Sequence, residues 1–254
     1  MKTLAIENSY CNDYPECKFD IYTPEKSGFE TIIWFHGGGL EAGNKKDAEK
    51  FAEGFIKAGY AFVSVEYRMY PNAKFPDYLV DCAKAVAFIK KNVKAYGGSE
   101  NGIYVSGSSA GAWIALMLCL NEEYLNNEGV RAQDISGWLI ESAQTTSHFN
   151  VLKYEKGENP KLERINEFAP LYYVSEKTNF TKIFLMFYDR DILCRYEQNM
   201  LFYKSVLAFN KNADITYQVL KGTHCRGSNE REEDGEFAFV KASLECLENW
   251  KGEI

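Results

Sequence analysis

The motif Gly-Ser-Ser-Ala-Gly at residues 107–111 constrains this 254-residue chain more than any other segment. It follows the apolar run 103–105 and precedes the small and apolar stretch 112–117, so the sequence predicts a strand, a sharp turn and a helix. In that context G-x-S-x-G is a nucleophile elbow, whose flanking glycines are needed because strand and helix approach closely around a strained serine. Without its flanks the motif would also fit an ordinary polar loop. The sequence therefore predicts Ser109 as a nucleophile and the chain as a serine hydrolase.

A serine nucleophile needs a base, and the chain has three histidines, His36, His148 and His224. In proteins with this elbow the chain order is serine, acid, histidine, which excludes His36 as the base. His224 follows the strand-like run 215–220, and catalytic loops gather at the carboxyl ends of strands in a parallel sheet. His148 has no such strand before it and is expected on the surface or in a lid. We therefore expect His224 to be the base.

The acid that orients the imidazole should follow an earlier strand. The apolar run 183–187 has the character of a strand buried on both faces, and Asp189 and Asp191 come directly after it. Either carboxylate could orient the histidine, and the residues alone do not choose between them. The other would be a surface charge or a turn-capping residue.

Donors for an oxyanion are predicted in the segment His36-Gly37-Gly38-Gly39, which follows the strand-like run 31–35. Glycines let backbone N–H groups face the oxyanion without obstruction, and the amide of Ala110, after the nucleophile, adds another donor. Losing one such donor typically costs about 3 kcal/mol of transition-state stabilisation. A flexible turn or a phosphate-binding loop would be the alternatives, but the Lys-Ser/Thr tail of a P-loop and the spacing of a dinucleotide fingerprint are both missing.

Together these segments resemble the hormone-sensitive-lipase-like esterases of the α/β-hydrolase superfamily, including small bacterial acetyl, feruloyl and formamidase-like members. Segments 66–71, 75–76 and 168–174, together with Asp81, also resemble that group, and the similarity covers roughly residues 17–250. The resemblance implies that Asp191 is the acid and that Gly38 and Gly39 are the oxyanion donors. It also implies an orienting, structural role for His36.

The resemblance and the alternating strand and helix signals predict one domain over residues 1–254. We expect an α/β-hydrolase fold with a mostly parallel central sheet and helices on both faces. Strands are expected at 18–22, 31–35, 103–105, 137–140, 183–187 and 215–220. Three helical stripes are expected to face the core; they are Leu79, Cys82, Val86, Ile89 and Val93, then Tyr196, Met200, Tyr203 and Leu207, and finally Phe237, Val240, Leu244 and Leu247.

Two features concern access to the site. Many members of the group have a long N-terminal cap, whereas the first strand-like segment here is 18–22, so we expect a more open site. Residues 143–181 form an unusually long connection, which is interpreted as a lid or a substrate-pocket insertion. A plain surface excursion with a short helix is the alternative reading of that segment.

Composition excludes several other classes. The chain is 46% hydrophobic and 26% charged, and Met1 to Tyr10 lack the features of a signal peptide. No stretch approaches the length of about 18 apolar residues that a membrane span needs, so a cytoplasmic location is expected. The net charge of −7 argues against nucleic acid or an anionic membrane as a partner, and a homodimer is one option for assembly.

The seven cysteines are odd in number and scattered, which predicts reduced thiols. Cys194 and Cys225 flank the predicted acid and base loops. A metal site with His224 is an alternative, but a fourth ligand and ligand spacing are missing, so small hydrophobic filling is expected.

These observations predict hydrolysis of carboxylic esters with short-chain, acetyl or aromatic acyl groups through an acyl-enzyme, without a cofactor or metal. An amidase or peptidase would use the same parts, and a non-catalytic binding protein would usually lack one of them.

Overall fold

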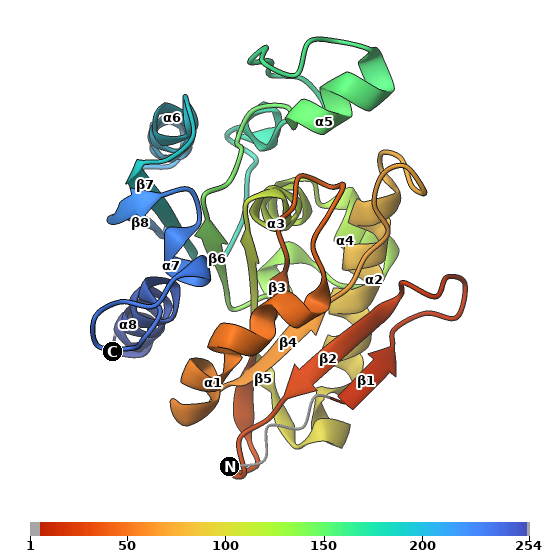
Figure 1. Ribbon diagram of the computed structural model, residues 1–254, viewed down its shortest axis with the longest axis vertical. Coiled ribbons are helices and arrows are strands. Elements are labelled where there is room, and N and C mark those ends of the chain that lie inside the picture. Colours follow the sequence, from red (N-terminus) through yellow and green to blue (C-terminus); the bar gives the residue numbers. More distant parts are fainter. Residues whose placement is uncertain (1–5, 253–254) are drawn as a thin grey trace.

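The central sheet of the computed structural model, which describes residues 6–252, has eight strands in the order β1-β2-β4-β3-β5-β6-β7-β8 (Figure 1). The strands are β1 (Ile6–Ser9), β2 (Lys18–Tyr22), β3 (Phe29–Phe35), β4 (Ala61–Val65), β5 (Gly98–Ser108), β6 (Gly137–Glu141), β7 (Ile183–Arg190) and β8 (Ile215–Thr223). β2 pairs antiparallel with β1 and with β4, and all other pairs are parallel. The predicted mostly parallel sheet is confirmed.

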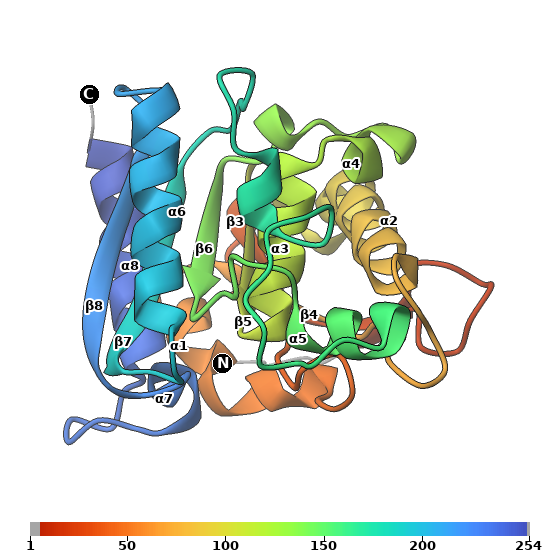
Figure 2. The same ribbon diagram turned by 90° about the horizontal axis from the view of Figure 1, so that it is seen from above.

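Helices cover both faces of the sheet (Figures 1 and 2). The α-helices are α1 (Glu49–Lys57), α2 (Asp77–Asn92), α3 (Ala110–Leu120), α4 (Glu123–Asn127), α5 (Phe149–Val151), α6 (Arg195–Phe209), α7 (Arg226–Asn229) and α8 (Ala238–Gly252). The shorter helical turns are η1 (Lys45–Ala48), η2 (Val93–Tyr96), η3 (Ala132–Asp134), η5 (Pro170–Tyr173) and the π-helical η4 (Leu152–Lys156). Apolar residues of α2, α3 and α6 join one core cluster, and those of α1 and α8 join the other. The arrangement is an α/β-hydrolase fold.

Side chains of β3 alternate between the two cores, as a strand with both faces covered requires. Ile33 and Phe35 lie in the core under α2 and α3, whereas Ile32 and Trp34 lie in the core under α1 and α8. β3 pairs with β4 on one side and β5 on the other, so the chain leaves the carboxyl ends of β3 and β5 in opposite directions. Such a switch point is where open α/β sheets place a binding crevice.

Close backbone packing joins β3, β5 and α3 at this switch point. A Cβ at Gly107 would overlap the backbone of Gly111, and a Cβ at Gly111 would overlap the carbonyl oxygen of Phe35. All residues of α3 are buried, which explains its apolar character on every side. The two glycines of the motif are therefore required by packing.

Two of the three predicted helical stripes agree with the structure. The five residues of the α2 stripe are buried, and Val240 and Leu247 of α8 are buried too. The stripe assigned to α6 agrees only in part: Met200, Tyr203 and Leu207 are partly buried against the core, whereas Tyr196 is 41% exposed. The most buried face of α6 carries Gln198, Phe202 and Val206. Because polar side chains lie on this buried face, the spacing of apolar residues in the sequence does not identify it.

The N-terminal segment corrects two expectations. Strand β1 precedes the segment 18–22 that was expected to be first, while residues 1–5 lie outside the described part of the chain. Cys11 and Cys17 form a disulfide, with Cα atoms 5.5 Å apart, so the prediction that all cysteines are reduced is wrong for this pair. No helix within residues 6–252 has the length and apolar character needed to cross a membrane.

The long connection after β6 has a buried beginning. Residues 143–148 are all buried, and the indole N–H of Trp113 on α3 donates to the carbonyl of Phe168 (3.0 Å), which fixes the far part of the segment. His148 is 1% exposed, so its expected place on the surface is wrong. Its Nδ1 accepts from the N–H of Asn150 at the start of α5 (3.2 Å), and its ring stacks on Phe149. Burial lowers the pKa of His148 to about 3.

The packing of the glycine motif predicts a large effect of one methyl group. Gly111→Ala is expected to destabilise the fold by about 2 kcal/mol or more, because the carbonyl of Phe35 belongs to a central strand and cannot move aside. Urea unfolding would measure the loss. Gly252→Ala is the matched control, since a Cβ there meets nothing within 4 Å. Equal stability of the two variants would contradict the packing argument.

The burial of His148 predicts an acid-sensitive fold. In the unfolded chain its pKa returns to about 6.5, so below that pH the unfolded state binds a proton that the folded state excludes. Stability should therefore fall as the pH drops from about 6.5 towards 3, with about 2 kcal/mol lost by about pH 5. His148→Asn keeps an acceptor at the start of α5 and should remove this part of the pH dependence. Parallel pH profiles of unfolding free energy for variant and wild type would refute this assignment.

Candidate active site

Ser109 lies between β5 and α3 in a strained backbone conformation, with φ 55° and ψ −113°. Its N–H donates to the carbonyl of Glu141 at the end of β6 (2.8 Å), and its carbonyl accepts from the N–H of Trp113 in the first turn of α3 (3.0 Å). These two bonds hold the turn on both sides. The Ser109 hydroxyl is presented at the carboxyl edge of the sheet, as the elbow motif predicts.

The side chains of His224 and Asp191 form a hydrogen-bonded line with Ser109. His224 follows β8, and its Nε2 lies 2.8 Å from the Ser109 Oγ. Its Nδ1 lies 2.5 Å from Oδ1 of Asp191, which follows β7. The structure thus brings together three residues that are far apart in the sequence. With Asp191 accepting at Nδ1, the imidazole can present Nε2 as an acceptor to the hydroxyl.

Asp191 is buried but well supplied with donors. Its side chain is 1% exposed, and its carboxylate also accepts from the Ser142 hydroxyl (2.7 Å) and the Ile192 N–H (2.8 Å). Burial by itself favours the neutral acid, but the hydrogen bond and charge of His224 and the bond from Ser142 hold the pKa of Asp191 below its usual range. The carboxylate is therefore ionised at neutral pH.

Asp189, the other carboxylate after the same strand, is directed elsewhere. Its oxygens accept from the N–H of Gly222 (2.8 Å) and from Nζ of Lys221 (3.0 Å), both on β8. It caps the pairing of β7 and β8 and makes no hydrogen bond to His224 within the described residues.

The glycine loop after β3 lies against the elbow. A Cβ on Gly37 would meet the Ser108 carbonyl at 3.1 Å and the Ser109 Cβ at 3.2 Å. Gly38 and Gly39 have φ values of 102° and 67°, a conformation that other residues rarely adopt. Among residues 6–252, the N–H groups of Gly38, Gly39 and Ala110 donate no hydrogen bond to another part of the chain.

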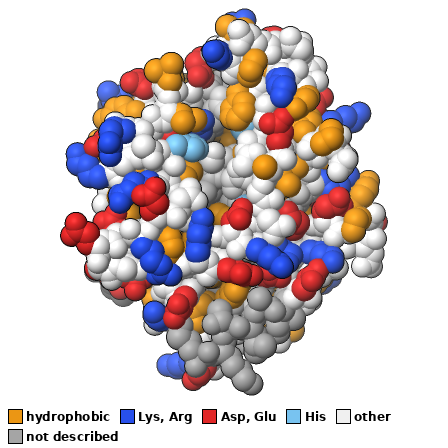
Figure 3. All heavy atoms as spheres, viewed as in Figure 1, with side chains coloured by type: hydrophobic (Ala, Val, Ile, Leu, Met, Phe, Trp, Pro, Cys, Tyr) orange, Lys and Arg blue, Asp and Glu red, His pale blue; other side chains and the backbone are white. Residues whose placement is uncertain are grey.

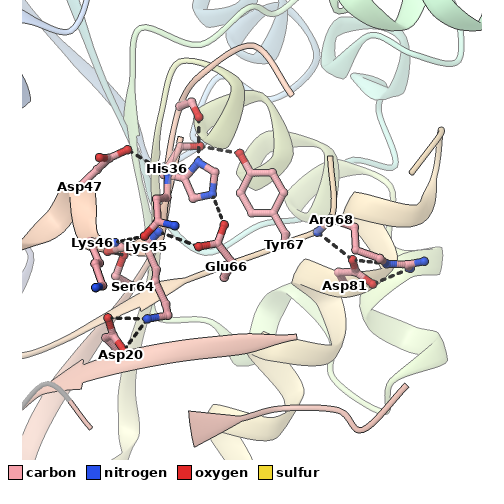
Figure 4. A network of polar contacts seen from close by, with 12 residues as sticks. Asp20, His36, Lys45, Lys46, Asp47, Ser64, Glu66, Tyr67, Arg68 and Asp81 are labelled. Atoms are coloured by element: carbon pink, nitrogen blue, oxygen red, sulfur yellow. Dashed lines mark hydrogen bonds and ion pairs between the residues drawn. The ribbon is translucent and has the colours of Figure 1, made fainter. Parts of the chain in front are cut away.

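His36 holds the start of this loop from within the core. Its Nδ1 lies 2.8 Å from the Gly37 carbonyl and its Nε2 lies 3.1 Å from Glu66 (Figure 4). The ring stacks on Tyr67 at 4.3 Å between centroids, and the Tyr67 hydroxyl donates to the His36 carbonyl (2.7 Å). His36 is fully buried and makes no contact of this kind with Ser109. This position fits the orienting role that the resemblance implied.

Glu66 extends the same network to the N-terminal strands (Figure 4). Its second carboxylate oxygen accepts from the N–H of Lys45 (3.1 Å). The buried Nζ of Lys45 binds both carboxylate oxygens of Asp20 on β2 at 2.9 Å, and its carbonyl accepts from the Ser64 hydroxyl (2.6 Å). The loop from β3 to α1 is thus fixed at both ends.

Asn150 is a contact to the glycine loop that the sequence did not indicate. This buried residue of α5 donates to the Gly39 carbonyl (2.7 Å) and to Glu41 (2.8 Å). It thereby ties the connection 143–181 to the predicted oxyanion donors. No local pattern of residues could have shown this, because the contact spans more than a hundred positions in the chain.

A cavity of about 460 Å³ opens beside Ser109. Apolar side chains of Trp34, Phe51, Phe149 and Ile192 line it together with the glycine loop. Polar side chains also line it; they are Asp47, Lys50, Ser108, Ser109, His224, Ser228 and Asn229. Histidine atoms are visible beside a hollow in Figure 3, and His224 is the histidine whose side chain reaches the surface, at 24% exposure.

Cys225 also lines the cavity, directly after His224. It is buried, and burial raises the pKa of its thiol above the usual range. Cys194 precedes α6 and is partly exposed. Within the described residues no group of three or more His, Cys, Asp or Glu side chains is arranged to hold a metal ion.

Sequence comparisons find similarity over part of the chain. Residues 19–137 match the family model BD-FAE. A probable isoprenylcysteine α-carbonyl methylesterase of Oryza sativa subsp. japonica is 29% identical over 55% of this chain and 32% of its own length. An AB hydrolase superfamily protein of Schizosaccharomyces pombe is 36% identical over 38% of this chain and 28% of its own length. The chain spans about a third or less of these curated relatives.

Solved structures match nearly the whole chain. Esterase B of Lactobacillus rhamnosis superposes with a TM-score of 0.78 at 14% identity, covering 96% of this chain and 84% of that one. The butyrate-bound esterase Est2 of Thermogutta terrifontis gives a TM-score of 0.78 at 17% identity, covering 96% of this chain and 94% of that one. At these identities the likeness concerns the fold. Sheet order, elbow geometry and structural similarity agree on an α/β-hydrolase fold, and part of the sequence is similar to the BD-FAE family and to a methylesterase.

Proposed function

We propose that this protein hydrolyses carboxylic esters through an acyl-enzyme on Ser109. The hydrogen-bonded line from Asp191 through His224 to the Ser109 hydroxyl, with distances of 2.5 and 2.8 Å, carries the proposal. A hydroxyl becomes a useful nucleophile at neutral pH only when a base accepts its proton, and this geometry provides that base. The methylesterase name of one relative supports the same reaction class.

In the first half of the reaction, the Ser109 Oγ attacks the ester carbonyl carbon while His224 Nε2 accepts its proton. The carbonyl oxygen becomes an oxyanion, and Asp191 stabilises the imidazolium. When the tetrahedral intermediate collapses, the bond to the leaving alkoxide breaks and His224 returns the proton to it. In the second half, water attacks the acyl-enzyme by the same route and releases the acid.

The oxyanion is assigned to the N–H groups of Gly38, Gly39 and Ala110. All three belong to segments that meet at Ser109, and none donates to an acceptor elsewhere in the described chain. Donors fixed in advance lower the barrier because they need no reorganisation as charge develops. Asn150 supports this arrangement by holding the Gly39 carbonyl.

We assign the connection 143–181 to the substrate pocket. Phe149 lines the cavity, whereas Asn150 and the buried residues before it anchor the segment to the glycine loop. A segment fixed in this way forms a wall of the pocket, and it need not open to admit substrate. The cavity of about 460 Å³ suits esters with small acyl groups, short-chain or aromatic.

The direct test is hydrolysis of p-nitrophenyl esters from acetate to decanoate by the wild type and by Ser109→Ala. The variant should lose about a million-fold in turnover, because the nucleophile and its base act as a unit. The chain-length profile of the wild type should favour short acyl groups. A matched anilide would report an amidase, and labelling with a serine-directed phosphonate would show whether Ser109 is activated at all.

Activity that persists in Ser109→Ala would show that the hydrolysis does not use this serine. A wild type that is labelled by the phosphonate but cleaves only the anilide would replace the esterase with an amidase. If the wild type neither reacts with the phosphonate nor cleaves either substrate, the protein would be a non-catalytic binding protein with this fold.

The two aspartates after β7 should differ sharply. Asp191→Asn is expected to lower kcat by about 10⁴-fold, because an amide in place of the carboxylate favours the wrong imidazole tautomer. Asp189→Asn should change kcat by less than about tenfold, since Asp189 bonds to Gly222 and Lys221. Steady-state kinetics of both variants on one ester would measure this, and equal losses would contradict the assignment of the acid.

A further inference from the structure

Glu141, the last residue of β6, has a fully buried carboxylate with no role in the proposed reaction. Its carbonyl accepts from the Ser109 N–H (2.8 Å), so its backbone already supports the elbow. A buried carboxylate is costly unless donors surround it, and here each oxygen has a hydroxyl donor.

The first donor is the hydroxyl of Ser108, the neighbour of the nucleophile. Its Oγ lies 2.5 Å from Glu141 Oε2 and 3.1 Å from the indole Nε1 of Trp34. An indole N–H can only donate, so the Ser108 oxygen is its acceptor and the Ser108 proton points to Glu141. Trp34 thus donates to Ser108, and Ser108 donates to Glu141, which is the final acceptor.

The second donor is the hydroxyl of Tyr188 on β7. It lies 2.6 Å from Glu141 Oε1 and 2.8 Å from the backbone N–H of Gly227, three residues after His224. This N–H can only donate, so the Tyr188 proton points to Glu141 as well. Both oxygens therefore accept, as an ionised carboxylate requires.

We propose that Glu141 is a positioning residue that joins the nucleophile loop to the histidine loop and places a second negative charge near His224. One chain of hydrogen bonds reaches it from the elbow and the other from the loop that carries His224, so a shift of either loop is resisted by the same carboxylate. The charge favours the imidazolium that forms during acyl transfer. This inference rests on the proposed function, because it concerns the same Ser109 and His224 pair.

The groups around Glu141 make the charge argument testable. Burial raises the pKa of Glu141, and the hydroxyl donors and the charge of His224 oppose this. The titratable groups that act on it are Tyr188 on β7 and His224 and Cys225 after β8. The pKa values of Tyr188 and Cys225 are raised by burial, so neither carries charge at neutral pH.

The test is Glu141→Gln, assayed on a short-chain p-nitrophenyl ester from about pH 5 to about pH 9. The side-chain nitrogen of a glutamine cannot accept a hydrogen bond, so either the Ser108 or the Tyr188 hydroxyl loses its acceptor. Neither hydroxyl can instead turn its proton the other way, because Trp34 Nε1 and the Gly227 N–H, which lie there, can only donate. We expect kcat to fall by about tenfold or more with KM little changed. The acid limb of the kcat/KM profile should move to lower pH by about half a unit, since the imidazolium loses a nearby negative charge.

Tyr188→Phe provides a second, less disruptive variant. It removes one hydroxyl, frees the Gly227 N–H from its acceptor and leaves the carboxylate in place. We expect a lower kcat at unchanged KM and slower reaction of Ser109 with a phosphonate. Glu30→Gln is the matched control, since Glu30 accepts from the Tyr104 hydroxyl (3.3 Å) at the opposite edge of the sheet and lies outside the site.

A shifted acid limb in Glu141→Gln together with an unshifted Glu30→Gln would support the proposal. If Glu141→Gln folds and keeps the wild-type kcat and pH profile, the proposal is wrong. If Glu141→Gln does not fold, Tyr188→Phe decides, and an unchanged kcat and phosphonate rate would overturn it. A wild type without ester hydrolysis or phosphonate labelling would instead defeat the proposed function, and the role of Glu141 with it.

Discussion

The close approach of α3 to the end of β3 is the constraint on which the rest of the site depends. Gly111 leaves no room for a side chain against the Phe35 carbonyl, and Gly37 in turn lies against Ser108 and Ser109. The close contact between these backbones therefore constrains both the conformation of the turn at Ser109 and the distance between Ser109 and the glycine loop. Larger residues at these positions would separate the predicted nucleophile from its oxyanion donors. Glycine is therefore required at these positions both by the packing of the backbone and by the proposed reaction.

Two buried carboxylates meet this centre in different surroundings. Asp191 receives donors that include the histidine, and these hold its pKa low, whereas burial raises the pKa of Glu141. Asp191 touches the imidazole directly, while Glu141 acts on the loops that carry Ser109 and His224. Environment thus separates the roles of two chemically similar groups. Burial of both also keeps the charges close to His224 in a region where water screens them weakly.

Much of this arrangement could be predicted from the sequence, because parallel strands deliver their carboxyl ends to one edge. Ser109, His224 and the pair Asp189 and Asp191 all follow apolar runs, and the structure places them at that edge. The choice between the aspartates needed the resemblance. A register shift between Tyr188 and Arg190 upsets the alternation from which the direction of each side chain would be read. The assignment of roles, the cytoplasmic location and a homodimer stay predictions.

The residues that the sequence did not reveal act through long-range contacts. Glu141 ends an apolar strand, so the rule that found Asp191 could have indicated it, but a glutamate there also fits a solvated strand end. Asn150 and His148 lie in a polar segment with no period, and only their burial shows that they are structural. The most buried face of α6 was missed for a related reason, because the polar residues Gln198 and Asn199 lie on it and a pattern of apolar residues does not include them.

The connection 143–181 links the shape of the pocket to the geometry of the reaction. Phe149 lines the cavity and its neighbour Asn150 holds the Gly39 carbonyl, so adjacent residues of one short helix face the substrate and the oxyanion loop. A change at Phe149 that moves α5 would also move Asn150. It would then alter kcat as well as the binding of the acyl group. In this fold, specificity and rate are therefore coupled through the first residues of the insertion.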